Sequence, residues 1–290
     1  MSAESRALGR LGSRYPARRI LITGATSGSG EALAVLFGRH GWRVAVTGRN
    51  PEKVALSAKK VRAAGGQVLE IELEVTRHED FERAARQVTE AWGGLDILVN
   101  NAGVAGGESI EDGSLDTWHR IIEINTFGVV HGCKAFVPVL RKSGGGHIAN
   151  IASIAAIVSA PEMASYNVSK AGVVALSETL DAELAADHID VTVACPGVFQ
   201  SDLGVEGRVV ASANARMIKS LRREQETTNQ TAEKVIGRIV KDMAKRRLYS
   251  LPDSDSQAQW TIKRLSPELS RRLIAFLYAR RLWKFAEMGD

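Results

Sequence analysis

Tyr166 and Lys170 are the residues of this chain whose types and spacing point most directly to acid–base chemistry. A spacing of four places both side chains on one face of a helix. An ammonium group beside a phenol favours the phenolate and lowers the pKa of the tyrosine, which is ordinarily about 10. The pair therefore predicts a proton-transfer group, Tyr166, tuned by its neighbour Lys170.

A glycine-rich segment near the N-terminus indicates a site for a phosphate-bearing ligand. It follows an apolar strand and leads directly into a helix. Glycines permit a tight turn and close approach of a pyrophosphate, and the helix N-terminus offers free N–H groups. The alternative is an ordinary glycine-rich connection. We expect ligand contacts from Gly24, Thr26, Ser27, Gly28, Ser29 and Gly30.

Arg49 stands at the end of the second predicted strand, where dinucleotide-binding proteins discriminate between NAD and NADP. An acidic side chain there would hold the ribose hydroxyls of NAD, and this sequence has none. A guanidinium group instead suits a 2′-phosphate. The sequence thus favours NADP as the cofactor, with NAD as the second choice. The alternative is that Arg49 is a solvated surface residue without a ligand.

Apolar strands alternate with amphipathic helices along most of the chain. This alternation indicates a parallel sheet covered on both faces, and right-handed crossovers then give a doubly wound α/β fold. We expect strands at residues 19–23, 43–47, 67–73, 95–99, 146–151 and 189–194, with a short one near 247–251. We expect helices at about 29–40, 51–64, 78–92, 115–141, 162–187 and 231–245.

The chain divides into one central domain, residues 18–256, and two basic ends. Residues 1–17 are predicted to form a disordered or loosely attached basic arm. Helical periodicity fades at about 200–230, which is predicted to be a substrate lid; its scattered apolar residues favour a lipophilic substrate. Residues 257–290 are predicted to be a basic amphipathic helical tail. Such a tail can lie on a membrane surface, but packing against protein is favoured.

These motifs follow one another along the chain in an order that resembles the short-chain dehydrogenase/reductase family. The resemblance covers about residues 18–250 and rests on the glycine-rich turn, Asn100-Asn101-Ala102-Gly103, Asn125, Ser153, Tyr166 with Lys170, and Pro196-Gly197. It implies a Rossmann fold and an NAD(P)-dependent oxidoreductase that interconverts a carbonyl and a secondary alcohol by hydride transfer. It also implies a homodimer or homotetramer.

The resemblance assigns roles to the residues expected at the reacting centre. Tyr166 would act as general acid in reduction and general base in oxidation. Lys170 would lower the pKa of Tyr166 and hold the nicotinamide ribose. Ser153 would hydrogen-bond the substrate carbonyl. Asn125 would anchor a water of the proton relay, the alternative being a helix-interior asparagine bonded to backbone.

The resemblance also implies contacts with the cofactor. Besides Tyr166, Lys170 and the glycine-rich turn, these would come from Glu74, Val75, Asn101, Ala102, Gly103, Pro196, Gly197, Phe199 and Ser201. Three positions depart from the family pattern: Ser29 stands for Ile or Leu, Glu74 for Asp, and Ser201 for Thr. We expect Ser29 to alter packing under the dinucleotide more than chemistry.

Composition narrows the class of protein. The formal net charge is +5 and 44% of residues are hydrophobic, as in a folded globular protein. Two distant cysteines, Cys133 and Cys195, fit a reducing, cytoplasmic setting and give no metal-ligand spacing, so no metal is expected. No secretory or membrane-spanning segment is predicted.

Two other classes of protein fit the sequence less well than an enzyme. A nucleic-acid-binding protein would need a recognised nucleic-acid-binding motif, and the sequence has none. A cofactor-binding regulator without turnover would not need Asn125, Ser153, Tyr166 and Lys170 together.

Overall fold

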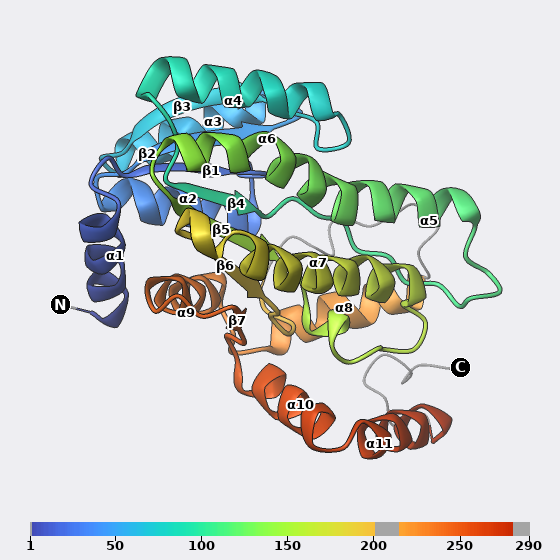
Figure 1. Cartoon of the computed structure of the whole chain (residues 1–290). Helices are drawn as coiled ribbons and strands as arrows, with labels where there is room; N and C mark the ends of the chain where they lie inside the picture. The colour runs from blue at the N-terminus through green and yellow to red at the C-terminus, as the bar shows by residue number, and fades with distance from the viewer. Residues whose placement is uncertain (1, 201–214, 281–290) are drawn as a thin grey trace.

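A seven-stranded parallel sheet forms the centre of the protein (Figure 1). The computed structural model describes residues 2–200 and 215–280. The strands lie in the order β3-β2-β1-β4-β5-β6-β7. Their bounds are β1 Arg19–Ile22, β2 Arg43–Gly48, β3 Gln67–Glu72, β4 Ile97–Asn100, β5 Gly146–Ile151, β6 Ile189–Ala194 and β7 Tyr249–Ser250. All neighbouring pairs are parallel, so the predicted doubly wound α/β fold is confirmed.

Both faces of the sheet are buried, and most side chains of the central strands β1 and β4 are apolar. Successive side chains of a strand point to opposite faces. Ile20 and Ile22 of β1 accordingly join one core cluster, whereas Leu21 between them joins the other. This explains why these strands read as continuous apolar runs rather than as alternating patterns.

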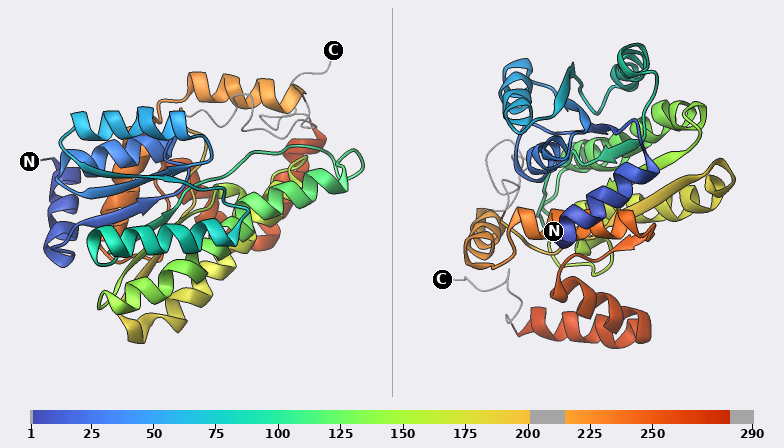
Figure 2. Two further views of the ribbon diagram at one scale, coloured as in Figure 1. Left: turned by 90° about the horizontal axis from the view of Figure 1, so that it is seen from above. Right: turned by 90° about the vertical axis from the view of Figure 1, so that its left-hand side faces the viewer.

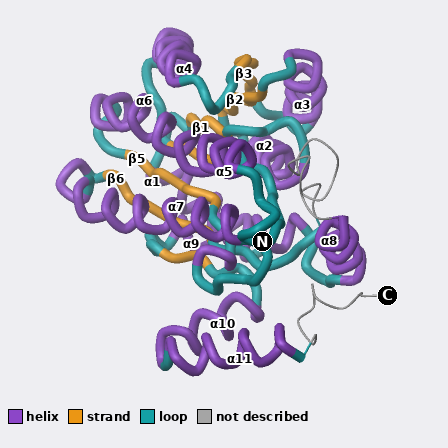
Figure 3. The backbone as a smooth tube through the Cα atoms, turned by 90° about the vertical axis from the view of Figure 1, so that its right-hand side faces the viewer, coloured by secondary structure: helices purple, strands orange, loops and turns teal. Residues whose placement is uncertain are grey.

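Helices cover the two faces of the sheet (Figure 3). One face carries α1 Ala3–Arg14, α2 Gly28–Arg39, α3 Pro51–Ala63 and α9 Ala232–Ala244. The other carries α4 His78–Trp92, α5 Leu115–Ile122, α6 Gly128–Lys142 and α7 Ala164–Glu183. Short helices η2 Ile154–Ala156 and η3 Ala185–Asp187 flank α7. Within the described ranges, no helix combines the length and apolar character needed to cross a bilayer.

The N-terminal segment differs from the expected loose arm, because it folds into the helix α1. Ser2 caps this helix, and Leu8 and Leu11 are buried against α9. Figure 2 shows α1 lying beside α9 at the edge of the molecule. The Tyr15 hydroxyl then donates to the Gly146 carbonyl at 3.0 Å. Arg6 and Arg10 are exposed on the outer face of this amphipathic helix, whereas Arg14 donates to the Ala244 carbonyl at 3.1 Å.

The helix expected at 115–141 is interrupted. A π-helical segment, η1 Glu123–Phe127, lies between α5 and α6 and contains Asn125. π-helical turns inside α-helices occur frequently at functional sites. The extra residue in this turn directs the buried Asn125 side chain toward the loop after β4, where it bonds the backbone of Val104.

The C-terminal tail also begins earlier than expected and is attached to the body. Helix α10 spans Ser254–Leu265 and α11 spans Pro267–Ala279. Asp253 caps α10, so the expected boundary at residue 257 falls inside this helix. Trp260 and Ile274 pack on the core cluster that contains α7. In the predicted lid, α8 Ala215–Thr227 is helical, and residues 201–214 lie outside the described part of the chain.

Candidate active site

The glycine-rich turn between β1 and α2 packs too tightly for side chains at two positions. Gly24 has a φ of +63°, and a Cβ there would lie 3.0 Å from the Ala102 Cα. A Cβ on Gly30 would lie 2.4 Å from the Gly24 carbonyl oxygen. The turn therefore brings its bare backbone to the start of α2, whose N-terminal N–H groups favour an anionic ligand.

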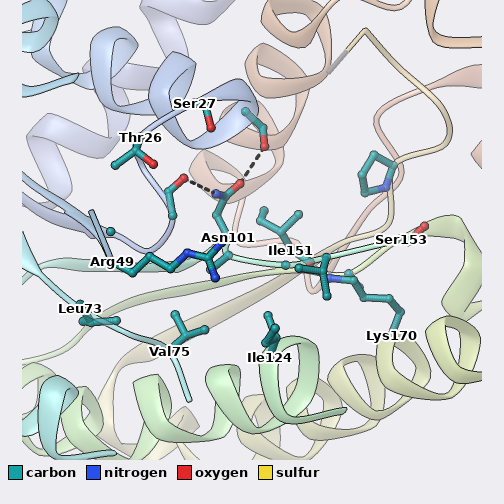
Figure 4. Close-up of a pocket in the computed structure, with 18 of the residues that line it drawn as sticks. Thr26, Ser27, Arg49, Leu73, Val75, Asn101, Ile124, Ile151, Ser153 and Lys170 are labelled. Atoms are coloured by element: carbon teal, nitrogen blue, oxygen red, sulfur yellow. Dashed lines mark hydrogen bonds between the residues drawn. The ribbon is translucent and has the colours of Figure 1, made fainter. Parts of the chain in front are cut away.

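Asn101 holds this turn against the end of β4. Its amide donates to the carbonyls of Thr23 at 2.9 Å and Gly24 at 3.3 Å. The Ser29 hydroxyl donates to the Asn101 Oδ1 at 2.8 Å, as the dashed line in Figure 4 marks. The departure at Ser29 thus adds a polar contact under the turn, where an Ile or Leu could only pack.

A cleft of about 620 Å³ runs along the carboxyl ends of the strands. The glycine-rich turn lies at one end, and Ser153 and Lys170 lie at the other (Figure 4). This is where strand order reverses about β1 and β4, the usual ligand position in open α/β sheets. Its lining includes these expected residues: Gly24, Thr26, Ser27, Ser29, Arg49, Glu74, Val75, Asn101, Ala102, Gly103, Ser153, Tyr166, Lys170, Pro196, Gly197 and Phe199.

Four expected residues are not part of this lining as described. Gly28 and Gly30 lie in the first turn of α2, where Gly30 is buried against Gly24. Asn125 is fully buried behind Gly103. Ser201 falls outside the described residues. Gly28, Gly30 and Asn125 therefore shape the cleft from behind rather than line it.

Two cations lie at the turn end of the cleft. Arg49, exposed at the end of β2, forms no ion pair with any residue that the structure describes, and Lys53 lines the cleft beside it. Asn50 caps α3 by accepting from the Lys53 N–H at 3.0 Å. Sequence reasoning missed Lys53. The sequence does contain a signal for Lys53. It stands one helical turn after Arg49, at a helix start that Asn50 caps and where Pro51 is the first residue.

Tyr166 and Lys170 share the first turns of α7 and are both buried. The Lys170 ammonium lies 5.9 Å from the centre of the Tyr166 ring and donates to the Ile151 carbonyl at 3.0 Å. Ser153 begins the short helix η2 after β5, and it caps that helix through the Ala155 N–H. The fold therefore brings the three expected residues to one end of the cleft.

The expected lowering of the Tyr166 pKa by Lys170 is not what the structure shows. Burial raises the pKa of Tyr166, and a hydrogen bond with Ser153 opposes that rise. Burial also lowers the pKa of Lys170, to about 8. Removal from water disfavours the charged form of each group, and it is the largest cause of each pKa shift. Tyr166 is consequently a protonated phenol at neutral pH, able to donate a proton.

The Asn125 side chain forms hydrogen bonds with the loop that follows β4. Its Oδ1 accepts from the Val104 N–H at 2.8 Å, and its amide donates to the Val104 carbonyl at 3.0 Å. The second amide hydrogen reaches the Ser169 hydroxyl at 3.1 Å. A Cβ on Gly103 would lie 3.2 Å from the Asn125 Oδ1 and 3.3 Å from the Lys170 ammonium. These bonds are those of the backbone-bonded alternative for Asn125, and the role of Asn125 in anchoring a water stays a prediction.

The cleft suits a nicotinamide dinucleotide. A bare glycine turn at a helix N-terminus can hold a pyrophosphate, and the cations Arg49 and Lys53 can hold a further phosphate. The far end offers a phenol, a hydroxyl and an ammonium for the reacting groups. The geometry therefore defines an enzyme of the Rossmann type with an acid–base group at the end of its dinucleotide cleft.

Comparison with known proteins identifies the family. The family model described as short chain dehydrogenase matches residues 18–211, more than half of the chain. The chain therefore belongs to the short-chain dehydrogenase/reductase family and is an oxidoreductase of that type. The matched range ends before α8, so the C-terminal helices lie outside it.

Two curated relatives show the extent of the similarity. The chain is 32% identical over 245 residues to the D-beta-hydroxybutyrate dehydrogenase of Rhizobium meliloti, covering 83% of this chain and 94% of that protein. It is 34% identical over 200 residues to an oxidoreductase of Thermotoga maritima, covering 69% of this chain and 78% of the other.

Solved structures agree with this assignment. A short chain dehydrogenase/reductase from Burkholderia phymatum in complex with NAD has a TM-score of 0.80 at 28% identity, covering 86% of this chain and 94% of that one. An alcohol dehydrogenase from Thermococcus sibiricus, complexed with 5-hydroxy-NADP, has a TM-score of 0.68 at 25% identity, covering 80% and 94%. Relatives of this fold thus bind NAD or an NADP-type nucleotide.

Proposed function

We propose that this enzyme transfers a hydride between NADP(H) and a carbonyl or secondary alcohol, with Tyr166 as the proton-transfer group. The observation that carries the proposal is the position of Tyr166, Ser153 and Lys170 at one end of the cleft, with the glycine-rich turn at the other. The bound nicotinamide would supply or accept the hydride. The chain itself supplies the groups that orient the substrate and move the proton.

Tyr166 is proposed to donate its proton to the carbonyl oxygen in reduction and to take it back in oxidation. Its raised pKa keeps the phenol protonated at neutral pH, which suits the reductive direction. The Ser153 hydroxyl is proposed to hydrogen-bond the same oxygen as charge develops. Lys170, held by the Ile151 carbonyl, is proposed to hold the nicotinamide ribose.

The preference for NADP is proposed from Arg49. Its guanidinium group lines the cleft at the end of β2, and Lys53 lies beside it on α3. Figure 4 shows the Arg49 side chain extending from the strand into the cleft. Two cations at a helix N-terminus favour the additional phosphate of NADP over the ribose hydroxyls of NAD.

The substrate is proposed to be a small or lipophilic ketone or secondary alcohol. Val104, Ile124, Ile151 and Phe199 give the cleft apolar walls. The relative from Rhizobium meliloti is named for hydroxybutyrate, itself a secondary alcohol. Most of the apolar lid residues from which the sequence predicted a lipophilic substrate lie outside the described residues.

Titration of wild type, Arg49→Ala and the control Arg39→Ala with NADPH and NADH tests the cofactor assignment. Arg39 is exposed at the far end of α2. We expect tighter NADPH binding in wild type and in the control, and a loss of roughly tenfold in Arg49→Ala. An unchanged preference in Arg49→Ala would show that Arg49 does not read the phosphate. Turnover against ketones, aldehydes and 3-oxoacyl thioesters then defines the substrate, and a wild type that binds neither cofactor would refute the function.

A further inference from the structure

Asp253 joins the C-terminal helices to the loop that closes the reacting end of the cleft. Its Oδ2 accepts from the Gly197 N–H at 2.8 Å. Its Oδ1 caps α10 by accepting from the Ser256 N–H at 2.8 Å, and the Ser256 hydroxyl donates to Oδ2, also at 2.8 Å. Asp253 and Ser256 are both buried. One carboxylate therefore serves a helix start and the backbone of a cleft-lining loop.

The peptide unit between Pro196 and Gly197 is fixed at both of its polar ends. Its N–H group donates to Asp253, and its carbonyl accepts from the Ile154 N–H at 2.9 Å. Ile154 directly follows Ser153 in the chain. Rotation of this peptide plane would break one bond or the other, so Asp253 and Ile154 together set the path of the loop relative to Ser153.

The loop also packs closely against the cap. A Cβ on Gly197 would lie 3.0 Å from the Asp253 Oδ1 and 3.2 Å from the Ser256 Oγ. The side chains of Asp253 and Ser256 therefore fill the space between the loop backbone and the start of α10. A small displacement of Asp253 would consequently move the Pro196–Gly197 peptide.

The same C-terminal helices contact the segment on the other side of Ser153. The Lys263 ammonium of α10 donates to the Ile157 carbonyl. The Tyr278 hydroxyl of α11 donates to the Glu162 carboxylate at 2.9 Å. Residues 157–162 connect Ser153 with Tyr166. The α10–α11 hairpin, which Figure 1 shows beyond the β7 edge of the sheet, thus braces both segments that border the reacting end.

We propose that Asp253 is a positioning residue for the nicotinamide end of the cofactor site. It acts through the Gly197 N–H, and this bond holds the loop of Pro196, Gly197 and Phe199 in the position from which it lines the cleft. The inference rests on the proposed function, because it assigns the nicotinamide to that end. The competing role is a helix cap alone, with no effect on the loop.

Asp253→Asn separates the two roles. An asparagine retains the Oδ1 that caps α10, and asparagine is as good a helix cap as aspartate. Its amide nitrogen cannot accept the Gly197 N–H, so the loop contact is lost, and the bond with the Ser256 hydroxyl can persist only with the amide as donor. Ser256→Ala, which lacks that second bond, accounts for the latter effect. Ser266→Ala is the matched control, because Ser266 caps the neighbouring helix α11 and has no contact with the loop. Ser256→Ala removes a bond to Oδ2 but leaves Gly197 bonded.

Binding is measured with two probes: NADPH, and 2′-phospho-ADP-ribose, which lacks the nicotinamide. In Asp253→Asn we expect the dissociation constant of NADPH to rise roughly tenfold, as for loss of a hydrogen bond to a charged group. Binding of the nicotinamide-free probe should stay unchanged. The melting temperature should fall no further than in Ser266→Ala, and Ser256→Ala should bind NADPH like wild type.

Other results would overturn the proposal. Unchanged NADPH binding in Asp253→Asn would leave Asp253 as a cap only. Equal weakening of both probes, with a larger loss of melting temperature than in Ser266→Ala, would indicate a general structural role. A wild-type protein that binds the nicotinamide-free probe but gains nothing from the nicotinamide would refute the positioning role alone. A wild type that binds neither probe would refute the proposed function and this inference with it.

Discussion

Lys170 donates to the Ile151 carbonyl at 3.0 Å and lies 5.9 Å from the centre of the Tyr166 ring, inside the protein. Burial lowers the pKa of Lys170 to about 8, so this amine loses its proton at a lower pH than an exposed lysine does. A buried ammonium group of this kind destabilises the folded state, so it indicates a function–stability compromise at the active site.

Lys170→Met is expected to stabilise the cofactor-free protein at pH 7 by about 1–3 kcal/mol while abolishing turnover. The pKa of Lys170 is lower in the folded protein than its ordinary value of 10.5, so the unfolded chain binds more protons between about pH 8 and 10.5. The unfolding free energy of wild type therefore gains a contribution as pH rises through this window, and the methionine variant lacks that contribution.

Urea denaturation at pH 7 and pH 10 measures this effect, with exposed Lys134→Met as the control. The stability advantage of Lys170→Met should shrink at pH 10, and the control should differ from wild type by less than about 0.5 kcal/mol at either pH. A Lys170→Met variant that is less stable than wild type at pH 7 would mean that the bond to Ile151 outweighs the cost of burying the charge.

Ser29→Ala is expected to weaken cofactor binding about twofold to fivefold, the range for losing one neutral hydrogen bond. The Ser29 hydroxyl bonds the Asn101 amide, which in turn holds the carbonyls of Thr23 and Gly24. The turnover number should remain within about twofold of wild type, since Ser29 belongs to the glycine-rich turn, whose Thr26 and Ser27 lie at the opposite end of the cleft from Lys170 (Figure 4). Fluorescence titration and steady-state kinetics check this, and a large fall in turnover with normal binding would contradict it.

Ser29→Ile separates packing from hydrogen bonding at the same position, because it restores the residue type usual in the family. It removes the bond to Asn101 but adds apolar contact beneath the turn. We expect binding between that of Ser29→Ala and wild type. Weaker binding than in Ser29→Ala would show that the pocket around Ser29 has no room for a larger side chain.

Leu11→Ala is expected to lower the unfolding free energy by about 2–5 kcal/mol, as for a large-to-small change in a core. Leu11 is fully buried between α1 and α9, although the sequence had suggested a loose arm. Leu56→Ala on α3 is the control, because that side chain is 63% exposed. Equal denaturation midpoints for the two variants would mean that α1 does not belong to the cooperative core.

The sheet could be predicted from the sequence because each strand is recognisable from its own residues. In strands β2, β5 and β6, four of the six residues are Gly, Ala, Val or Ile, and these strands lie within one residue of their expected positions. The glycine-rich turn and the Tyr166–Lys170 pair are local patterns of the same kind. Each depends on residues that are neighbours in the sequence, so periodicity and spacing suffice to find them.

The features that were missed depend on contacts distant in the sequence. Helix α1 is stable because Leu8 and Leu11 meet α9, more than 200 residues away in the chain. The π-helical turn at Asn125 depends on Val104, and the role of Asp253 depends on Gly197. The raised pKa of Tyr166 depends on burial, which spacing alone cannot show.

Tyr166→Phe provides the most direct test of the central claim, that a buried phenol moves the proton. The variant keeps the aromatic ring and loses only the hydroxyl. With a substrate that wild type turns over, we expect kcat to fall by about 10²–10⁴-fold while the dissociation constant of NADPH stays within about threefold. Turnover of the same substrate at the wild-type rate would contradict the mechanism.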